Sequence, residues 1–233
     1  MKATTIGWIL SLLLTTSIGN AGEYLVKYKN MAALNNMAAM ETQAIGLQMK
    51  SLNRVAHLVK VQIDKKNEAR AMVALYSDKN VEYVVPNFKI HSFMNPVTVT
   101  SLREQYSLAK VNAEQAWKRA GNKGSRNVIL AIIDTGVDYK HPNLAPNVVA
   151  GYDFKDNDAD PMDVVGSQNP GHGTHCAGIV GATGLIDGGV QGMSPEVSIM
   201  PLRFLDKNGS GDLNNAIKAI DYAIDKKVDV ISA

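Results

Sequence analysis

The chain has 233 residues, of which 45% are hydrophobic and 20% are charged, so it can bury a sizeable core as one or two globular domains. Its net charge is +2, and no cluster of lysine and arginine with interleaved aromatic residues occurs, which argues against a nucleic-acid partner. The single cysteine, Cys176, excludes an intramolecular disulfide.

The first 21 residues have the pattern of a secretory signal peptide. Lys2 precedes an apolar stretch over residues 6–18, and the small residues 19–21 follow it. This stretch is too short to span a bilayer comfortably, and no later segment is apolar enough to do so. The sequence therefore predicts a secreted protein, extracellular or periplasmic, that makes no membrane contact after cleavage at Ala21.

Residues 22–92 alternate strand-like and helix-like stretches in the order βαββαβ. This order predicts a small α+β domain of ferredoxin-like type, a helix-backed antiparallel sheet. The methionines at helical spacing, Met31, Met37 and Met40, are interpreted as core filling. The predicted elements are strands at 23–28, 46–49, 55–63 and 81–90, and helices at 31–40 and 68–76.

Residues 96–233 have a different pattern, in which continuous apolar runs are typical of parallel strands covered on both faces. The runs lie at 127–133, 197–205 and 228–231, and they predict a partial doubly wound parallel sheet, an α/β fold. A helix is predicted between the last two runs, with Ser210 or Asp212 as its N-cap. Its apolar stripe comprises Leu213, Ala216, Ile217, Ile220 and Ile224.

The sequence stops at Ala233, inside an expected buried strand and without a turn or capping residue behind it. Natural domains rarely end in this way. We therefore expect a C-terminally truncated sequence.

Asp134 follows the first of these runs, at the carboxyl end of a predicted strand, where open α/β sheets place their ligands and chemistry. The triplet Asp134-Thr-Gly also fits the paired-aspartate proteases, in which two carboxylates share a proton. A plain structural interpretation is an aspartate that caps the next turn. The triplet alone leaves all three open.

Residues 170–181 bring His172, His175 and Cys176 together between glycines, at the predicted start of a helix. A zinc site is disfavoured because no acidic residue lies between the two histidines and their spacing is not that of the zinc motif. A redox site normally needs a second cysteine, so Cys176 is interpreted as a buried packing thiol. The remaining possibility is that His172 is a general base, with Asp134 holding its tautomer. The small residues of this helix predict close packing against it.

The two motifs together resemble the signatures of the subtilisin-like serine proteases. The residues concerned are Asp134-Thr-Gly-Val-Asp138, His141-Pro142 and His172-Gly-Thr-His-Cys-Ala-Gly178. Residues 24–91, which include Val81-Glu-Tyr-Val-Val-Pro-Asn87, resemble the family's inhibitory propeptide. Residues 106–117 are similar to the first helix of its catalytic domain, and residues 199–205 resemble a core strand.

This resemblance implies a secreted serine endopeptidase precursor: signal peptide 1–21, propeptide 22–92, and half a catalytic domain over 96–233. It implies Asp134 as the orienting carboxylate and His172 as the general base. Gly209, Ser210 and Gly211 resemble the loop that binds the substrate backbone. His175 is interpreted as a partly buried helix residue without a catalytic role.

The family's serine nucleophile motif lies beyond residue 233, so the chain as given is expected to be inactive. Its partners are protein or peptide substrates and its own propeptide; lysine and arginine predominate in residues 22–95, and aspartate and glutamate in residues 96–233. The alternative is that only the propeptide region is functional, as an inhibitor or chaperone of an intact protease.

Residues 153–163 are rich in aspartate, and such oxygen-rich loops bind calcium. No other cofactor is expected to be required. The alternative is a solvated acidic loop, since no glutamate follows at the spacing of an EF-hand. The candidate ligands are Asp156, Asp158, Asp160 and Asp163.

Overall fold

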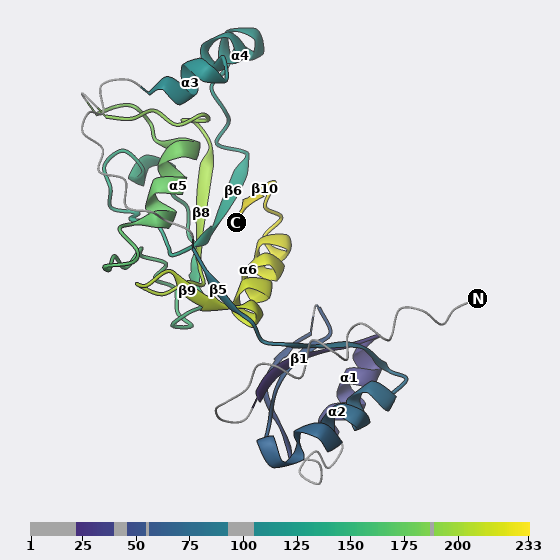
Figure 1. Ribbon diagram of the computed structural model, residues 1–233. Coiled ribbons are helices and arrows are strands. Elements are labelled where there is room, and N and C mark those ends of the chain that lie inside the picture. The colour runs from purple at the N-terminus through teal and green to yellow at the C-terminus, as the bar shows by residue number, and fades with distance from the viewer. Residues whose placement is uncertain (1–21, 40–45, 55, 93–104, 187–188) are drawn as a thin grey trace. The chain divides into compact units, whose positions relative to one another are not determined.

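The computed structural model of the protein describes residues 22–39, 46–54, 56–92, 105–186 and 189–233 (Figure 1). The chain forms two compact units, Met1–Asn87 and Phe88–Ala233. The predicted export signal lies outside the described residues. Within the described part, no helix has both the length and the apolar character needed to cross a membrane.

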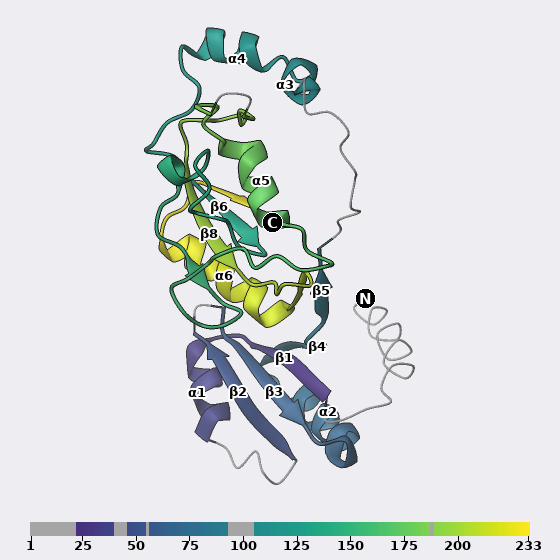
Figure 2. The same cartoon turned by 90° about the vertical axis from the view of Figure 1, so that its left-hand side faces the viewer.

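In its described residues, the first unit contains a four-stranded antiparallel sheet and two α-helices (Figure 2). The strands lie in the order β2-β3-β1-β4, and the strands and α-helices follow one another as βαββαβ, as the sequence predicted. The strand predicted over residues 81–90, with a bend at Pro86, is divided there into β4 and a separate strand, β5 (Lys89–His91). The elements are β1 (Gly22–Tyr28), α1 (Met31–Ala39), β2 (Leu47–Asn53), β3 (Leu58–Ile63), the short 3-10 helix η2 (Lys65–Asn67), α2 (Glu68–Ser77) and β4 (Val81–Pro86).

The core of the first unit follows from the period-two pattern of β1, because Tyr24, Val26 and Tyr28 all point into one apolar cluster. Helix α1 adds Leu34 and Met37, which are buried in the same cluster. The interpretation of the methionines as core filling is confirmed for Met37. Met40 lies outside the described residues.

Tyr28 makes this core sensitive to alkaline pH. Burial, followed by the nearby charge of Asp78, raises the pKa of its phenol from 10.0 to about 12. The folded state therefore holds this proton more tightly, so the stabilisation is complete below pH 10.0 and is lost as the pH rises toward about 12. We expect the melting temperature to fall across this interval, and to fall less steeply in Tyr28→Phe. Calorimetry at closely spaced pH values measures both slopes, and equal slopes would contradict the assignment.

The second unit is built on four parallel strands in the order β10-β6-β8-β7. Three of them correspond to the three predicted apolar runs. The short strand β7 was not predicted from the sequence. The strands are β6 (Ile129–Asp134), β7 (Tyr152–Asp153), β8 (Ser198–Arg203) and β10 (Val230–Ser232).

Helices cover both faces of this sheet, as Figures 1 and 2 show. Ala131 and Ile133 of β6 pack into the cluster that contains α6 (Leu213–Asp225). Ile132, which points the other way, packs with α5 (His172–Gly181). The alternation of side chains along β6 thus places the two helices on opposite faces of the sheet, which is the arrangement expected from the sequence.

The predicted apolar stripe of α6 was wrong in part. The side chains that face the sheet are the small Ala216, Ala219 and Ala223, whereas Ile220 is 39% exposed and Ile224 is 60% exposed. The predicted N-cap is confirmed, because the Asp212 side chain accepts a hydrogen bond from the backbone N–H of Asn215.

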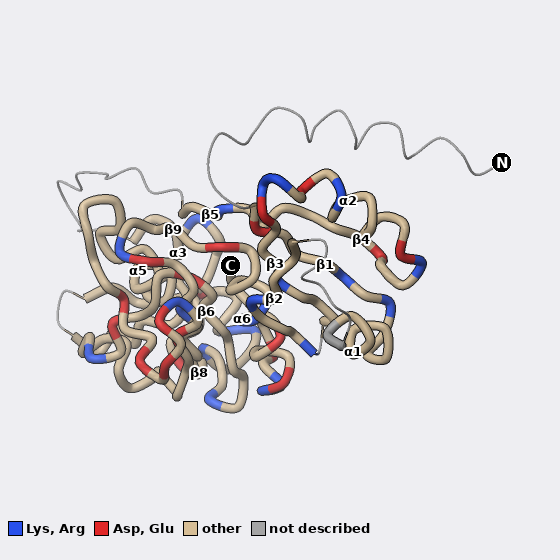
Figure 3. The backbone as a smooth tube through the Cα atoms, turned by 90° about the horizontal axis from the view of Figure 1, so that it is seen from below, with Lys and Arg blue, Asp and Glu red and all other residues tan. Residues whose placement is uncertain are grey.

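The region that resembles the family's first catalytic-domain helix forms two helices, α3 (Tyr106–Lys110) and α4 (Ala113–Ala120). They are separated at Asn112, whose φ of 54° is in the left-handed region. Lysine, arginine, aspartate and glutamate are distributed along the backbone of both units, as the blue and red segments of Figure 3 show.

Candidate active site

Asp134 ends strand β6, and its carboxylate is almost fully buried. One carboxylate oxygen accepts a hydrogen bond of 2.6 Å from the backbone N–H of Thr135. A buried carboxylate needs such donors because water cannot solvate it. The position at the carboxyl end of a parallel strand is the one that the sequence predicted.

His172 is the first residue of α5, and the helix approaches β6 closely enough to bring the two side chains together. The approach depends on Gly173: a Cβ atom there would lie 2.1 Å from the carbonyl oxygen of Gly136. Close packing is also seen at Gly181, where a Cβ would be 2.8 Å from a side-chain carbon of Ile199. Gly178 has nothing within 4 Å, so close packing accounts for only some of the glycines.

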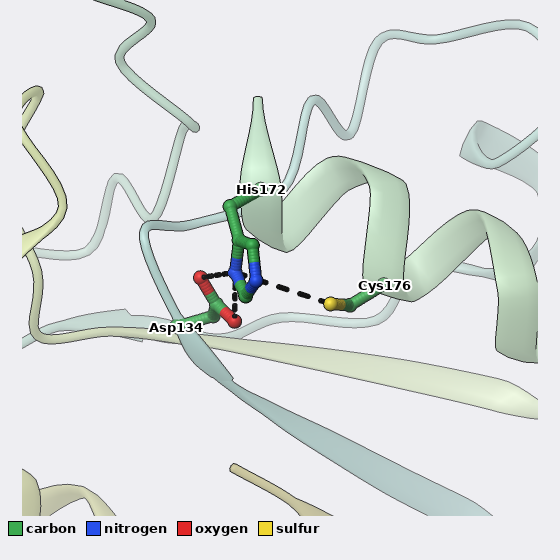
Figure 4. A group of neighbouring side chains, drawn as sticks. All are labelled: Asp134, His172 and Cys176. Atoms are coloured by element: carbon green, nitrogen blue, oxygen red, sulfur yellow. Dashed lines mark hydrogen bonds and ion pairs between the residues drawn. The ribbon is translucent and has the colours of Figure 1, made fainter. Parts of the chain in front are cut away.

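The imidazole of His172 is held by the carboxylate of Asp134, and Figure 4 shows the two side chains facing one another. Nδ1 lies 2.8 Å from both carboxylate oxygens. Since a carboxylate can only accept, Nδ1 carries the proton and the neutral ring has its lone pair on Nε2. The His172 side chain is 22% exposed, which leaves the ring within reach of a reacting group.

The loop at Gly209, Ser210 and Gly211 holds an extended segment of the chain. Strand β9 (Ser210–Asp212) pairs antiparallel with β5 (Lys89–His91). Past the end of β5, the backbone N–H of residue 92 donates to the Gly209 carbonyl oxygen over 2.8 Å. Gly209 has a φ of +68°, and a Cβ there would lie 2.1 Å from the hydroxyl oxygen of residue 92. The three residues predicted to bind substrate therefore lie where the backbone pairs with an extended segment of this chain.

Comparison with known proteins identifies this arrangement. A profile described as the subtilase family matches residues 125–233, which include Asp134 and His172. Residues 125–233 belong to the subtilase family. Among its relatives, the "Thermophilic serine proteinase" of Bacillus sp. (strain AK1) is 36% identical over 212 residues, which are 91% of this chain and 51% of that protein. Thermitase of Thermoactinomyces vulgaris is 44% identical over 128 residues, 55% of this chain and 43% of that protein.

The chain spans about half the length of these two proteins. Relatives named as intracellular and as extracellular proteases are both among the matches. The crystal structure of fervidolysin from Fervidobacterium pennivorans, described as a keratinolytic enzyme related to subtilisin, superimposes with a TM-score of 0.66. Its sequence is 24% identical to this one. The superposition covers 93% of this chain and 36% of fervidolysin, and it shows a likeness of fold.

Cys176 lies one helical turn from His172, with its sulfur 4.0 Å from Nδ1. Burial, followed by the charges of Asp134 and Asp163, raises the pKa of its thiol to about 11. The thiol is therefore protonated at neutral pH, as suits a packing role. The prediction of a buried thiol is right in part, since Cys176 is partly buried against the apolar cluster beside α5. Among the described residues, Asp134, His172 and Cys176 form the group whose donor atoms, all within 4.8 Å of one another, could hold a metal ion.

The four aspartates predicted as calcium ligands have separate partners. Asp156 pairs with Arg203, which also pairs with the buried Asp153. Asp158 and Asp160 accept from a backbone N–H and from the Tyr139 hydroxyl, respectively. Their described positions do not bring three of these carboxylates together.

Asp163 is directed instead toward α5, where one of its oxygens accepts from Thr174. Sequence reasoning missed this contact and the Arg203–Asp153 pair. It also missed the buried side chain of Asn169, which accepts a hydrogen bond from the backbone N–H of His172 over 2.8 Å. Asn169 lies three residues before His172, and that proximity was the available signal. His175, predicted to be partly buried, is exposed.

Proposed function

We propose that the chain is the N-terminal part of a secreted subtilisin-like serine endopeptidase, in which Asp134 and His172 are two members of an Asp-His-Ser triad. The observation that carries this proposal is the contact of Nδ1 of His172 with both oxygens of Asp134, at 2.8 Å each, inside a segment of the subtilase family. Peptide-bond hydrolysis needs a base with this tautomer.

In this mechanism, Nε2 of His172 removes the proton from the attacking serine hydroxyl. The Asp134 carboxylate then stabilises the imidazolium, which later donates its proton to the leaving amine. Among the described residues, no hydroxyl is hydrogen-bonded to Nε2 of His172, and we assign the nucleophile and the oxyanion donors to sequence beyond residue 233. The 233-residue chain alone is accordingly proposed to be inactive.

The substrates are proteins or peptides that bind as an added strand along Gly209, Ser210 and Gly211. The pairing of β5 with β9 supports this mode, because backbone bonds recognise any extended peptide whatever its sequence. Ile90 of β5 is partly buried against the apolar cluster beneath β9, so a bound segment also presents side chains to the protein.

Residues 22–92 are proposed as an inhibitory propeptide of ferredoxin-like topology, whose C-terminal strand occupies the substrate loop. The strand order β2-β3-β1-β4 and the β5–β9 pairing support this role. Secretion is proposed from the signal-like pattern of residues 1–21. Edman sequencing of exported protein tests it, since cleavage after Ala21 gives a chain that begins Gly-Glu-Tyr.

The test of the function compares the 233-residue chain with the product of the same reading frame continued beyond residue 233. The longer product is expected to cleave a chromogenic peptide and to lose this activity with a serine-directed inhibitor. The shorter chain is expected to stay at the background rate. An inactive longer product, or inhibitor-sensitive cleavage by the shorter one, would contradict the proposal. Inhibition of thermitase by the shorter chain, together with an inactive longer product, would instead favour the alternative that only residues 22–92 are functional, as an inhibitor or chaperone.

A further inference from the structure

The first turn of α5 has no cap of its own. Its N-cap residue is Gly171, which has no side chain and a φ of +103°. The first N–H groups of a helix need partners from outside the helix, particularly when they are buried. Here Asn169, which is fully buried, accepts from the backbone N–H groups of Gly171 and His172 over 3.1 and 2.8 Å.

Two further side chains complete this cap. The Thr135 hydroxyl oxygen accepts from the backbone N–H of Gly173 over 2.9 Å. Asp163 accepts from the backbone N–H of Thr174 over 3.0 Å, and from the Thr174 hydroxyl over 2.7 Å. Every N–H of the first turn is therefore satisfied by a side chain from a neighbouring segment.

Asp163 also connects two of these capping groups. Its second oxygen accepts from the Asn169 side-chain amide over 3.0 Å. Together with the bond of 3.2 Å from the same amide to the Val164 carbonyl oxygen, this contact orients Asn169 so that its side-chain oxygen faces the backbone of His172. Asp163 is only 7% exposed, yet both its oxygens are hydrogen-bonded, as a buried carboxylate requires.

The charge of Asp163 matters because the N-terminus of a helix carries partial positive charge. A cation that forms on the first residue of a helix is disfavoured there, and His172 must become a cation if it acts as a base. Asp134 and Asp163 are the two buried carboxylates beside this turn. Both charges reach the site, since both contribute to the raised pKa of the Cys176 thiol, after the larger effect of burial.

We propose that Asp163 is a positioning residue, which through Asn169 and Thr174 fixes the first turn of α5 so that Nδ1 of His172 stays on Asp134. The proposal rests on the function proposed above for His172, but its structural part does not require peptidase activity. Asp163 touches neither the imidazole nor a substrate in this role. It acts through the backbone that carries the base.

The test uses the whole 233-residue chain and measures hydrogen exchange of the His172 Nδ1 proton, seen by NMR as a low-field resonance. In Asp163→Asn only one side-chain atom can still accept, so a donor NH₂ group must face either the Asn169 amide or the backbone N–H of Thr174, and the cap loosens. We expect exchange at least about fivefold faster than in the wild type, the factor that one net hydrogen bond is typically worth. Thr174→Val removes the hydroxyl that donates to Asp163 and that accepts from the backbone N–H of Asp138, but it keeps the backbone N–H bond to Asp163, so it is expected to change the rate in the same direction and by less.

Two controls separate this effect from loss of charge or of stability. Asp225→Asn removes an exposed carboxylate, and Ile199→Val weakens the core beside α5 without touching the cap. Both are expected to keep the wild-type exchange rate within about twofold, less than the value of one hydrogen bond. If Asp163→Asn does not fold, the exchange rate of the His172 Nδ1 proton in Thr174→Val tests the proposal in its place.

An unchanged exchange rate in Asp163→Asn would overturn the proposal, and so would an unchanged rate in Thr174→Val if that variant replaces it. Exchange that is accelerated equally in Ile199→Val would overturn it as well. Absence of the low-field resonance from the wild type would instead count against the proposed triad itself. In the longer, active protein, a fall in kcat at constant KM for Asp163→Asn supports positioning of the base, and a change confined to KM contradicts it.

Discussion

Asp134→Asn is expected to lower kcat of the full-length peptidase about ten-thousand-fold, the loss typical of triads whose carboxylate becomes an amide. An amide cannot accept from Nδ1 at both of its atoms. Its NH₂ group donates toward the ring and favours the tautomer with the proton on Nε2. That nitrogen then has no lone pair with which to take the proton of the nucleophile.

The measurement is kcat and KM on one peptide substrate, with circular dichroism to establish that the variant is folded. His175→Ala is the matched control, because His175 is exposed and lies on the same helix one residue before Cys176. It should keep kcat within about threefold, since an exposed side chain with no contact to the reacting atoms contributes little to the barrier. If Asp134→Asn retained a tenth of the wild-type kcat, Asp134 would not be the orienting carboxylate.

The sheet and the Asp134–His172 contact could be predicted from the sequence because both depend on local patterns. The apolar run that becomes β6 leads directly into Asp134, so the position of the carboxylate follows from the strand. The start of α5 at His172 follows from the glycine before it, whose backbone adopts a conformation open to few other residues. The spatial contact then required only that strand and helix be neighbours.

Features that depend on distant partners could not be predicted in this way. The face of α6 is an example: hydrophobicity favoured Ile220 and Ile224, but the residues of this helix that are buried in the cluster are alanines. The acidic loop is another. Asp156 and Asp163 have the same side chain, yet one pairs with Arg203 and the other caps α5. The sequence carries the donors and acceptors but not their pairing.

Gly173→Ala is expected to destabilise the second unit by about 1–3 kcal/mol, the usual cost of overpacking, and to move His172 away from Asp134. The new Cβ would lie 2.1 Å from the Gly136 carbonyl oxygen and 3.1 Å from Cβ of Asp134, and neither can yield as a flexible side-chain end could. Denaturant unfolding followed by Trp117 fluorescence measures the free energy, because Trp117 lies in α4 of this unit.

Gly178→Ala is the matched control, since it makes the same change on the same helix where nothing lies within 4 Å. It should stabilise the unit by about 0.5–1 kcal/mol, because alanine loses less backbone entropy in a helix than glycine does. The two substitutions share their helix propensity and differ only in the space around the new methyl group. Changes of opposite sign in the free energy of unfolding would show that closeness to β6 explains the glycine at position 173. A stabilising Gly173→Ala would mean that α5 can shift from the sheet without loss of stability. The geometry of the Asp134–His172 pair would then not depend on this contact.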